Sequence, residues 1–304
     1  MSIATLILVL SLSLLIGLSL GILGGGGSIL TVPILVYVAG FEAKEAIAAS
    51  LFVVGTTSLV GALGHAKAGR VRWRTGLIFG AAGMVGAFGG GLLGGYIPGQ
   101  VLLVAFAVMM LVTSLAMLRG RKPVDPNKQY KDLPLGRVLL DGAAVGLVTG
   151  LVGAGGGFLV VPALALLGGL PMSLAVGTSL VVIAMKSFAG LAGYMTTVAI
   201  DWNTTLMVTG VAVVGSLVGS KIAGRISEDK LRAAFGWFVL AMGVFMLSQD
   251  VPGQFRLPLI GAAAVLAVVV FVRQRKKSAT PRAPEGVLEA ETDPQAAEGT
   301  TPAH

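Results

Sequence analysis

The sequence predicts an all-α, polytopic helical membrane protein with two inverted-topology repeats and glycine-broken segments. Apolar residues make up 55% of its 304 residues, charged residues make up only 12%, and the mean hydropathy is +0.90. Lipid therefore suits most of the chain better than water does. Long apolar segments recur from Ile3 to Val272, and a glycine-rich stretch in the first of them has a second copy later in the chain.

The first apolar segment, residues 3–39, is interrupted by four consecutive glycines, Gly24 to Gly27. It has no positively charged start and no cleavage site, so we interpret it as a retained membrane segment and not as a secretory signal. Glycine costs roughly 1 kcal/mol against alanine inside a helix, so the chain unwinds easily there. Pro33 then favours a new helical start or a kink. The segment is longer than one span of about 20 residues, so we expect it to enter and return on the same side.

The stretch "GLVTGLVGAGGGFLVVP" from Gly146 to Pro162 repeats the one that begins at Gly17, an offset of 129 residues. The same offset pairs Trp73 with Trp202, and roughly thirty identities fall in about a hundred positions without a gap. We therefore divide the chain into a first membrane repeat (1–118), a basic cytoplasmic linker (119–137), a second repeat (138–248), a final transmembrane helix (249–272) and a tail (273–304). The second broken segment is 138–169.

Loop charges predict the orientation. Residues 65–74 and the linker are basic and should be cytoplasmic, with the spans 75–96 and 101–118 between them. In the second half the basic loop is 224–232, which corresponds to the outer turn of the first half. The halves should therefore face opposite ways, as in secondary transporters. Basic residues 273–277 place the C-terminus in the cytoplasm and the N-terminus in the periplasm. We expect seven clear spans, nine if the broken segments count, and a disordered tail that transport does not need.

Several function classes are excluded. The chain has no cysteine and two distant histidines, so thiolate and histidine metal sites do not fit. The net charge of +8 lies largely in short loops between spans, where topology explains it better than nucleic-acid binding does. No Lys-Ser or Lys-Thr follows the glycines, so a P-loop is excluded. No paired carboxylates or histidine cluster support an enzyme, and we expect no cofactor.

The glycine breaks are the first candidate substrate site. Unwound backbone at membrane depth is tolerated where protein buries it or a polar cavity hydrates it. Freed amides and the positive end of a half-helix can hold an anion, and freed carbonyls a cation. The alternative is close helix packing, which small residues commonly permit. The candidates are Gly24, Gly25, Gly26, Gly27, Gly153, Gly155, Gly156 and Gly157.

Lys186 is the second candidate. It lies in the middle of the span 174–197, which contains no Asp or Glu. A lysine there costs at least about 3 kcal/mol, so we expect it to face a cavity and attract an anionic substrate. Snorkelling and a structural pair with Asp141 or Asp201 are the alternatives. Its counterpart in the first half is Thr57, so the site should be asymmetric.

Hydroxyl groups beside the breaks are further candidates, although Ser and Thr in membranes often bond to carbonyls of their own helix. The predicted substrate-binding hydroxyls are Ser50, Thr57, Thr178 and Ser179, and Thr56, Ser58 and Ser187 lie near them. His65 lies at a loop boundary, where it either titrates with coupled protons or is an ordinary interfacial residue.

The motifs "GGGGSILTVP" and "GAGGGFLVVP", each followed by "ASL" or "GTSL", resemble the TauE/SafE sulfite exporter family of membrane permeases. The resemblance covers residues 17–247. It implies transport of small anions, often sulfur-containing ones such as sulfite or organosulfonates, across the bacterial inner membrane. The first copy departs from the second by carrying Ser28 where the second has Gly157.

These observations predict a secondary transporter that moves a small anion by alternating access around the two breaks. Its partners would be the anionic substrate, the lipid bilayer and a possible coupling ion. An anion channel is the main alternative, and a membrane scaffold that binds partners through its tail is another.

Overall fold

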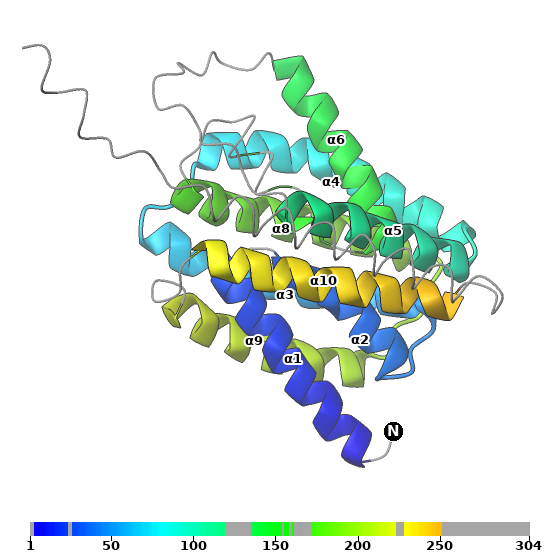
Figure 1. The fold of residues 1–304 in the computed structure, drawn as a ribbon. Coiled ribbons are helices and arrows are strands. Elements are labelled where there is room, and N and C mark those ends of the chain that lie inside the picture. Colours follow the sequence, from blue (N-terminus) through cyan, green and yellow to red (C-terminus); the bar gives the residue numbers. More distant parts are fainter. Residues whose placement is uncertain are drawn as a thin grey trace, which may run out of the picture. The chain divides into compact units, whose positions relative to one another are not determined.

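The computed structural model describes residues 3–23, 26–118, 135–153, 155–157, 160, 164, 172–222 and 228–250. Helix is the regular structure in all of these ranges, so the predicted all-α fold is confirmed (Figure 1). The elements in chain order are α1 (Ile3–Leu23), the 3-10 helix η1 (Gly26–Leu30), α2 (Thr31–Tyr37), α3 (Ala43–Lys67), α4 (Trp73–Tyr96), α5 (Gly99–Leu118), α6 (Leu135–Val152), α8 (Met172–Tyr194), α9 (Trp202–Ile222) and α10 (Glu228–Asp250).

Six of the described helices are long and apolar enough to cross a bilayer, so the protein is a multi-pass membrane protein. Their spans are Ile3–Ile22, Ala43–Lys67, Trp73–Tyr96, Gly99–Ala116, Leu174–Tyr194 and Trp202–Lys221. Shorter apolar stretches occupy α6 and α10, at Val138–Val152 and Gly236–Gln249. Residues 119–134 of the predicted linker and residues 251–304, which hold nearly all of the predicted last span and the tail, lie outside the described residues.

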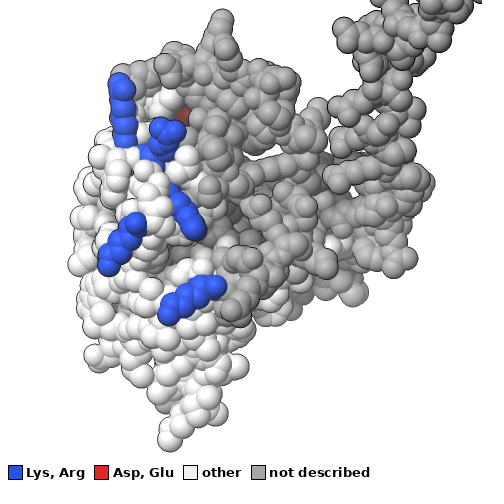
Figure 2. Space-filling model, turned by 90° about the vertical axis from the view of Figure 1, so that its left-hand side faces the viewer, with Lys and Arg blue, Asp and Glu red and all other residues white. Residues whose placement is uncertain are grey.

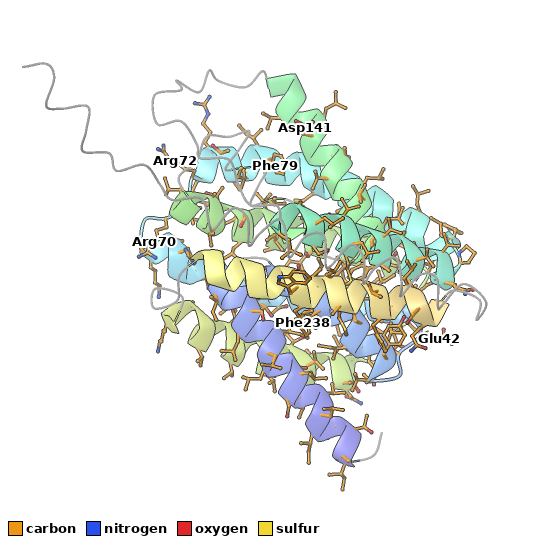
Figure 3. All side chains as sticks on the ribbon, in the orientation of Figure 1. Glu42, Arg70, Arg72, Phe79, Asp141 and Phe238 are labelled. Atoms are coloured by element: carbon orange, nitrogen blue, oxygen red, sulfur yellow. The ribbon has the colours of Figure 1, made fainter. Side chains whose placement is uncertain are left out.

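Most charged side chains of the described residues lie at or near the ends of the helices. Arg70 and Arg72, in the loop between α3 and α4, mark one end of the bundle, and Glu42, just before α3, marks the other (Figure 3). Lys and Arg side chains gather on the face at the first end (Figure 2). The middle of the bundle is formed mainly by apolar and small polar residues, as a membrane interior requires, and Lys186 of α8 is a buried charged residue among them.

The first glycine-broken segment doubles back on itself. Val9, near the start of α1, packs in one cluster with Leu35, near the end of α2. Ile16, further along α1, packs with Ile29 and Leu30 of η1. η1 and α2 therefore return alongside α1, the helix that precedes them, as the length of the segment predicted.

Close helix pairs follow the 129-residue offset between the halves. α1 packs against α9, and α6, the counterpart of α1, packs against α4, the counterpart of α9 (Figure 1). A Cβ at Gly17 of α1 would overlap the carbonyl of Ala212 in α9. A Cβ at Gly146 of α6 would overlap the carbonyl of Gly83 in α4. The same glycine thus permits the same backbone approach twice, each time between helices of different halves.

The centre of the bundle is the contact between α3 and α8, which are also counterparts. They are the most buried spans, with 67% and 72% of their apolar windows buried against at most 39% for the other four. Gly61 faces Leu180, and Leu51 faces Gly190, so the two helices run antiparallel. The 129-residue offset relates Gly61 to Gly190 and Leu51 to Leu180, so it converts one pair into the other. The inverted-repeat arrangement itself stays a prediction, as does the orientation of the halves relative to a bilayer.

Candidate functional site

The second glycine break begins where α6 ends at Val152. Gly153, Gly155 and Gly156 have φ of +76°, +58° and +64°. This left-handed conformation costs other residues about 1–2 kcal/mol each, which explains why glycine stands at these positions. The backbone then returns to helical geometry, since the N–H of Val160 donates to the carbonyl of Gly156 at 3.0 Å. The predicted unwinding is therefore present at this place.

α3 packs directly against this break. The Ser50 hydroxyl lies 2.7 Å from the carbonyl oxygens of both Ile47 and Gly153, so it bonds to the break as well as to its own helix. A Cβ at Gly153 would also meet Ile47, and one at Gly155 would overlap the side chain of Val54. A residue with any side chain at these glycines would push α3 away.

α8 reaches the break from the other side through Lys186. This side chain is only 1% exposed. Its Nζ donates to Thr149 Oγ1 of α6 at 3.2 Å, and a Cβ at Gly156 would overlap Nζ. Within the described part of the chain, Thr149 is its hydrogen-bond partner and no carboxylate pairs with it. Lys186 therefore neither snorkels to the surface nor forms a structural ion pair with a described residue, and its ammonium group lies at the left-handed turn.

Ser187 adds a hydroxyl to the same place. Its Oγ is buried and has no hydrogen-bond partner among the described residues. A Cβ at Gly155 would lie 3.3 Å from this oxygen, so the hydroxyl faces the glycine turn. A buried hydroxyl without a partner is unfavourable, and a ligand at the turn would satisfy it.

Tyr194, at the end of α8, anchors the end of α6 that leads into the break. Its hydroxyl donates to the carbonyl of Leu151, two residues before Gly153. The ring itself is fully buried. α8 therefore holds the break at two levels, through Lys186 and through Tyr194.

The remaining predicted hydroxyls do not join this cluster. Thr57 donates to the carbonyl of Val53 at 2.6 Å, and Ser179 donates to that of Val176 at 2.8 Å, both within their own helices. Thr178 accepts a hydrogen bond from the N–H of Arg72 at 2.9 Å, at the basic end of the bundle. For these three residues the structure favours the own-helix or end-of-helix interpretation.

The first break is described only in part. Gly24 and Gly25 lie outside the described residues, whereas Gly26 and Gly27 begin η1. Ile29 and Leu30 of η1 pack in the same cluster as Ile47 of α3, the residue that also meets Gly153. α2, which follows the first break, packs against α3, the helix that contacts the second break. Thr31, just after η1, is buried, and its hydroxyl has no partner among the described residues.

Two residues at the site, Thr149 and Tyr194, were not predicted from the sequence. Thr149 contacts Lys186, although 37 positions separate them. Its counterpart under the repeat is the apolar Leu20, so the repeat gave no signal for it. Among the described residues, no group of three or more His, Cys, Asp or Glu is placed to hold a metal ion.

Residues 9–246 match the family described as Sulfite exporter TauE/SafE. The chain belongs to the TauE/SafE family. Proteins named "Probable membrane transporter protein" are similar to it: one from Xylella fastidiosa (strain 9a5c) is 34% identical over 81% of this chain and 97% of its own length. MJ0441 from Methanocaldococcus jannaschii is 30% identical over 79% of this chain and 96% of its own length. YdhB from Bacillus subtilis is 26% identical over 79% of this chain and 99% of its own length. No solved structure matches the chain.

The TauE/SafE match contains both glycine breaks, Lys186 and the α3–α8 contact, and it ends before the tail. The family resemblance predicted from the doubled glycine motif is thus confirmed. The site described above lies in the part of the chain that the family shares.

Proposed function

We propose that this TauE/SafE protein is a secondary transporter that moves a small anion across the bacterial plasma membrane by alternating access. The observation that carries the proposal is Lys186, whose ammonium group is buried at an unwound glycine turn between α3, α6 and α8. A charge at membrane depth is costly and usually functional. A substrate anion would supply the opposite charge, since no carboxylate of the described residues pairs with Lys186.

The family and the relatives support the class of protein. The family is described as a sulfite exporter, and the similar proteins are named probable membrane transporters. A sulfur-containing anion, sulfite or an organosulfonate, is therefore the substrate that we propose. The chain has no nucleotide-binding motif, so an ion gradient or the substrate gradient would drive transport.

The geometry suggests how the anion is held. Lys186 would contribute the charge, and Ser187 would donate its uncommitted hydroxyl proton to the anion. The left-handed turn at Gly155 and Gly156 brings main chain close to both side chains, because no Cβ intervenes. Left-handed turns can point successive amide N–H groups toward an anion. Gly153 and Ser50 would then fix the turn against α3.

The packing suggests how the site opens to each side in turn. α3 and α8 occupy equivalent places in the two halves and run antiparallel. The glycine-lined pairs α1 with α9 and α4 with α6 tie each half to helices of the other. Rocking of these groups around the central contact would expose the turn alternately, with the N-terminus in the periplasm and the C-terminus in the cytoplasm.

Reconstitution in proteoliposomes tests the proposal. We expect labelled sulfite to enter vesicles that contain the wild-type protein, and unlabelled sulfite inside should accelerate entry, as counterflow in a carrier does. Lys186→Met should abolish uptake, whereas Lys221→Met should keep it, because Lys221 is an exposed residue in the last turn of α9. Comparable insertion of both variants is checked by their yield in the membrane fraction.

Two results would contradict the proposal. Uptake without counterflow, at rates far above carrier turnover, would identify an anion channel. Uptake by Lys186→Met equal to that by Lys221→Met would remove Lys186 from the transport mechanism.

A further inference from the structure

We infer that the site at Lys186 accepts singly charged anions and discriminates against dianions. The inference rests on the proposed function and adds the charge class of the substrate. It follows from a count of charges and of hydrogen-bond donors around the buried ammonium group.

The sequence between Asp141 and Asp201 contains a single residue of the types Asp, Glu, His, Lys and Arg, and that residue is Lys186. Among the described helices, α3, α4 and α6 pack most closely against α8. In α3 and α4 the charged and titratable residues lie near the ends, and they are Lys44, Glu45, His65 and Lys67 in α3 and Arg74 and Tyr96 in α4. In α6, Arg137 lies in the first turn, and Asp141, which is partly exposed, lies about two turns into the helix and forms no ion pair with Lys186 in the described part of the chain. The glycine-broken residues 153–171 contain no charged residue.

Hydrogen-bond donors at the site are also few. The Thr149 hydroxyl lies 3.3 Å from the carbonyl of Gly146 and accepts from Lys186, so its proton is committed to its own helix. The Ser50 hydroxyl bonds to carbonyls of Ile47 and Gly153. Among the described side chains at the turn, Lys186 and Ser187 remain as donors for an anion.

A buried ion is tolerated when an opposite charge and hydrogen bonds compensate for its lost hydration. One ammonium group balances one negative charge, so a bound monoanion leaves the interior neutral. A dianion leaves one negative charge uncompensated in the same dry place. The neutral hydroxyl of Ser187 does not balance it. The arrangement should therefore favour hydrogensulfite or an alkylsulfonate over sulfate or a disulfonate.

Methanesulfonate and sulfate are a suitable pair of probes, because a methyl group replaces one charged oxygen and the size changes little. Each competes with labelled sulfite for uptake by wild-type proteoliposomes, and each is tested for thermal stabilisation of the purified full-length protein. We expect methanesulfonate to compete, with sulfate weaker by at least about tenfold, a difference of about 1.4 kcal/mol. Lys186→Arg, which keeps the single charge, should retain this preference.

A second measurement uses sulfite itself, which exists near neutral pH as both the monoanion and the dianion. Its apparent affinity should rise as the pH falls from 8 to 6, whereas the affinity for methanesulfonate, whose charge is constant, should not follow the same curve. The methanesulfonate series thus separates titration of the substrate from titration of Lys186 or His65.

The outcomes separate the two proposals. If sulfite is transported and sulfate competes as well as methanesulfonate does, the charge selectivity is wrong and the transporter proposal stands. If the wild-type protein transports no sulfite and binds neither probe, both are wrong. If Lys186→Met still binds methanesulfonate and rejects sulfate, the selectivity exists but Lys186 is not its source, and the inference is overturned.

Discussion

Thr149→Asp is the sharpest perturbation that the site offers, because it adds a carboxylate beside Lys186 without touching the lysine. The Thr149 hydroxyl oxygen lies 3.2 Å from Lys186 Nζ, so an aspartate oxygen at this position would pair with the ammonium group. Two unit charges at that separation attract each other by about 5 kcal/mol at an effective dielectric constant of about 20. The built-in carboxylate would then take the place of the substrate anion.

We expect Thr149→Asp to lose anion affinity by on the order of a thousandfold, since about 1.4 kcal/mol corresponds to each factor of ten. Thr149→Asn is the matched control, with nearly the same shape and no charge. Its amide oxygen still accepts from Lys186, so the ammonium group remains available to an anion. The measurement is sulfite binding to the purified proteins, followed by uptake in proteoliposomes.

Thermal unfolding of the two variants separates loss of the site from loss of the fold. An unpaired buried charge destabilises the folded protein. The carboxylate introduced by Thr149→Asp pairs with Lys186, whose charge has no counter-ion among the described residues. The thermal midpoint of Thr149→Asp should therefore be no lower than that of Thr149→Asn. Equal sulfite affinity of the Asp and Asn variants, with both folded, would refute the idea that the charge of Lys186 attracts the substrate.

Three further predictions concern the glycine turn, the contact between α4 and α6, and the start of α9. Gly156→Ala should lower the free energy of unfolding by about 1–2 kcal/mol, because the φ of Gly156 is +64°. It should also weaken sulfite binding, because the new Cβ overlaps Lys186 Nζ. Gly64→Ala, at an open helical position, should change neither the stability nor the binding. Gly146→Leu should lower the stability by about 2 kcal/mol or more, because its side chain meets the α4 backbone, while Gly64→Leu should leave the thermal midpoint nearly unchanged. Asp201→Ala should cost about 1 kcal/mol at pH 7, because this exposed carboxylate caps α9. Hydrogen bonds from Thr204, its hydroxyl first, and from the N–H of Asn203 hold the pKa of Asp201 below its ordinary value. The stabilisation by the ionised cap is therefore fully present above about pH 4 and is lost as the pH falls through the lowered pKa of Asp201. The difference in thermal midpoint between the wild type and Asp201→Ala should be smaller at pH 3 than at pH 7.

The membrane fold and the place of the central site were accessible from the sequence because both depend on local signals. A lysine in the middle of an apolar span and a run of glycines each stand out against a lipid-soluble background. The structure buries Lys186 at the second break, where those two signals meet. Substrate binding by these residues remains a prediction.

The hydroxyl groups were harder to predict, because their bonds depend on which helix faces them. Ser50 and Thr57 lie two turns apart on α3, and both were predicted as site residues. Ser50 faces the break, where it bonds to Gly153, while Thr57 bonds to Val53. Thr149 gave no signal, since its role depends on the packing of α6 near α8 and its repeat counterpart is apolar. Such contacts are set by tertiary packing and not by spacing within a segment.

The repeat also explains why one half carries the charge. Lys186 of α8 and Thr57 of α3 are counterparts on the two helices that form the central contact. Two lysines at these positions would place like charges in one dry interior, where repulsion and lost hydration both oppose folding. One lysine avoids that repulsion, and it leaves a single positive charge for a substrate to neutralise. Equivalent backbones with different side chains therefore produce similar packing around an asymmetric site, and under our proposal the single charge of Lys186 in the second half sets the charge of the anion that binds.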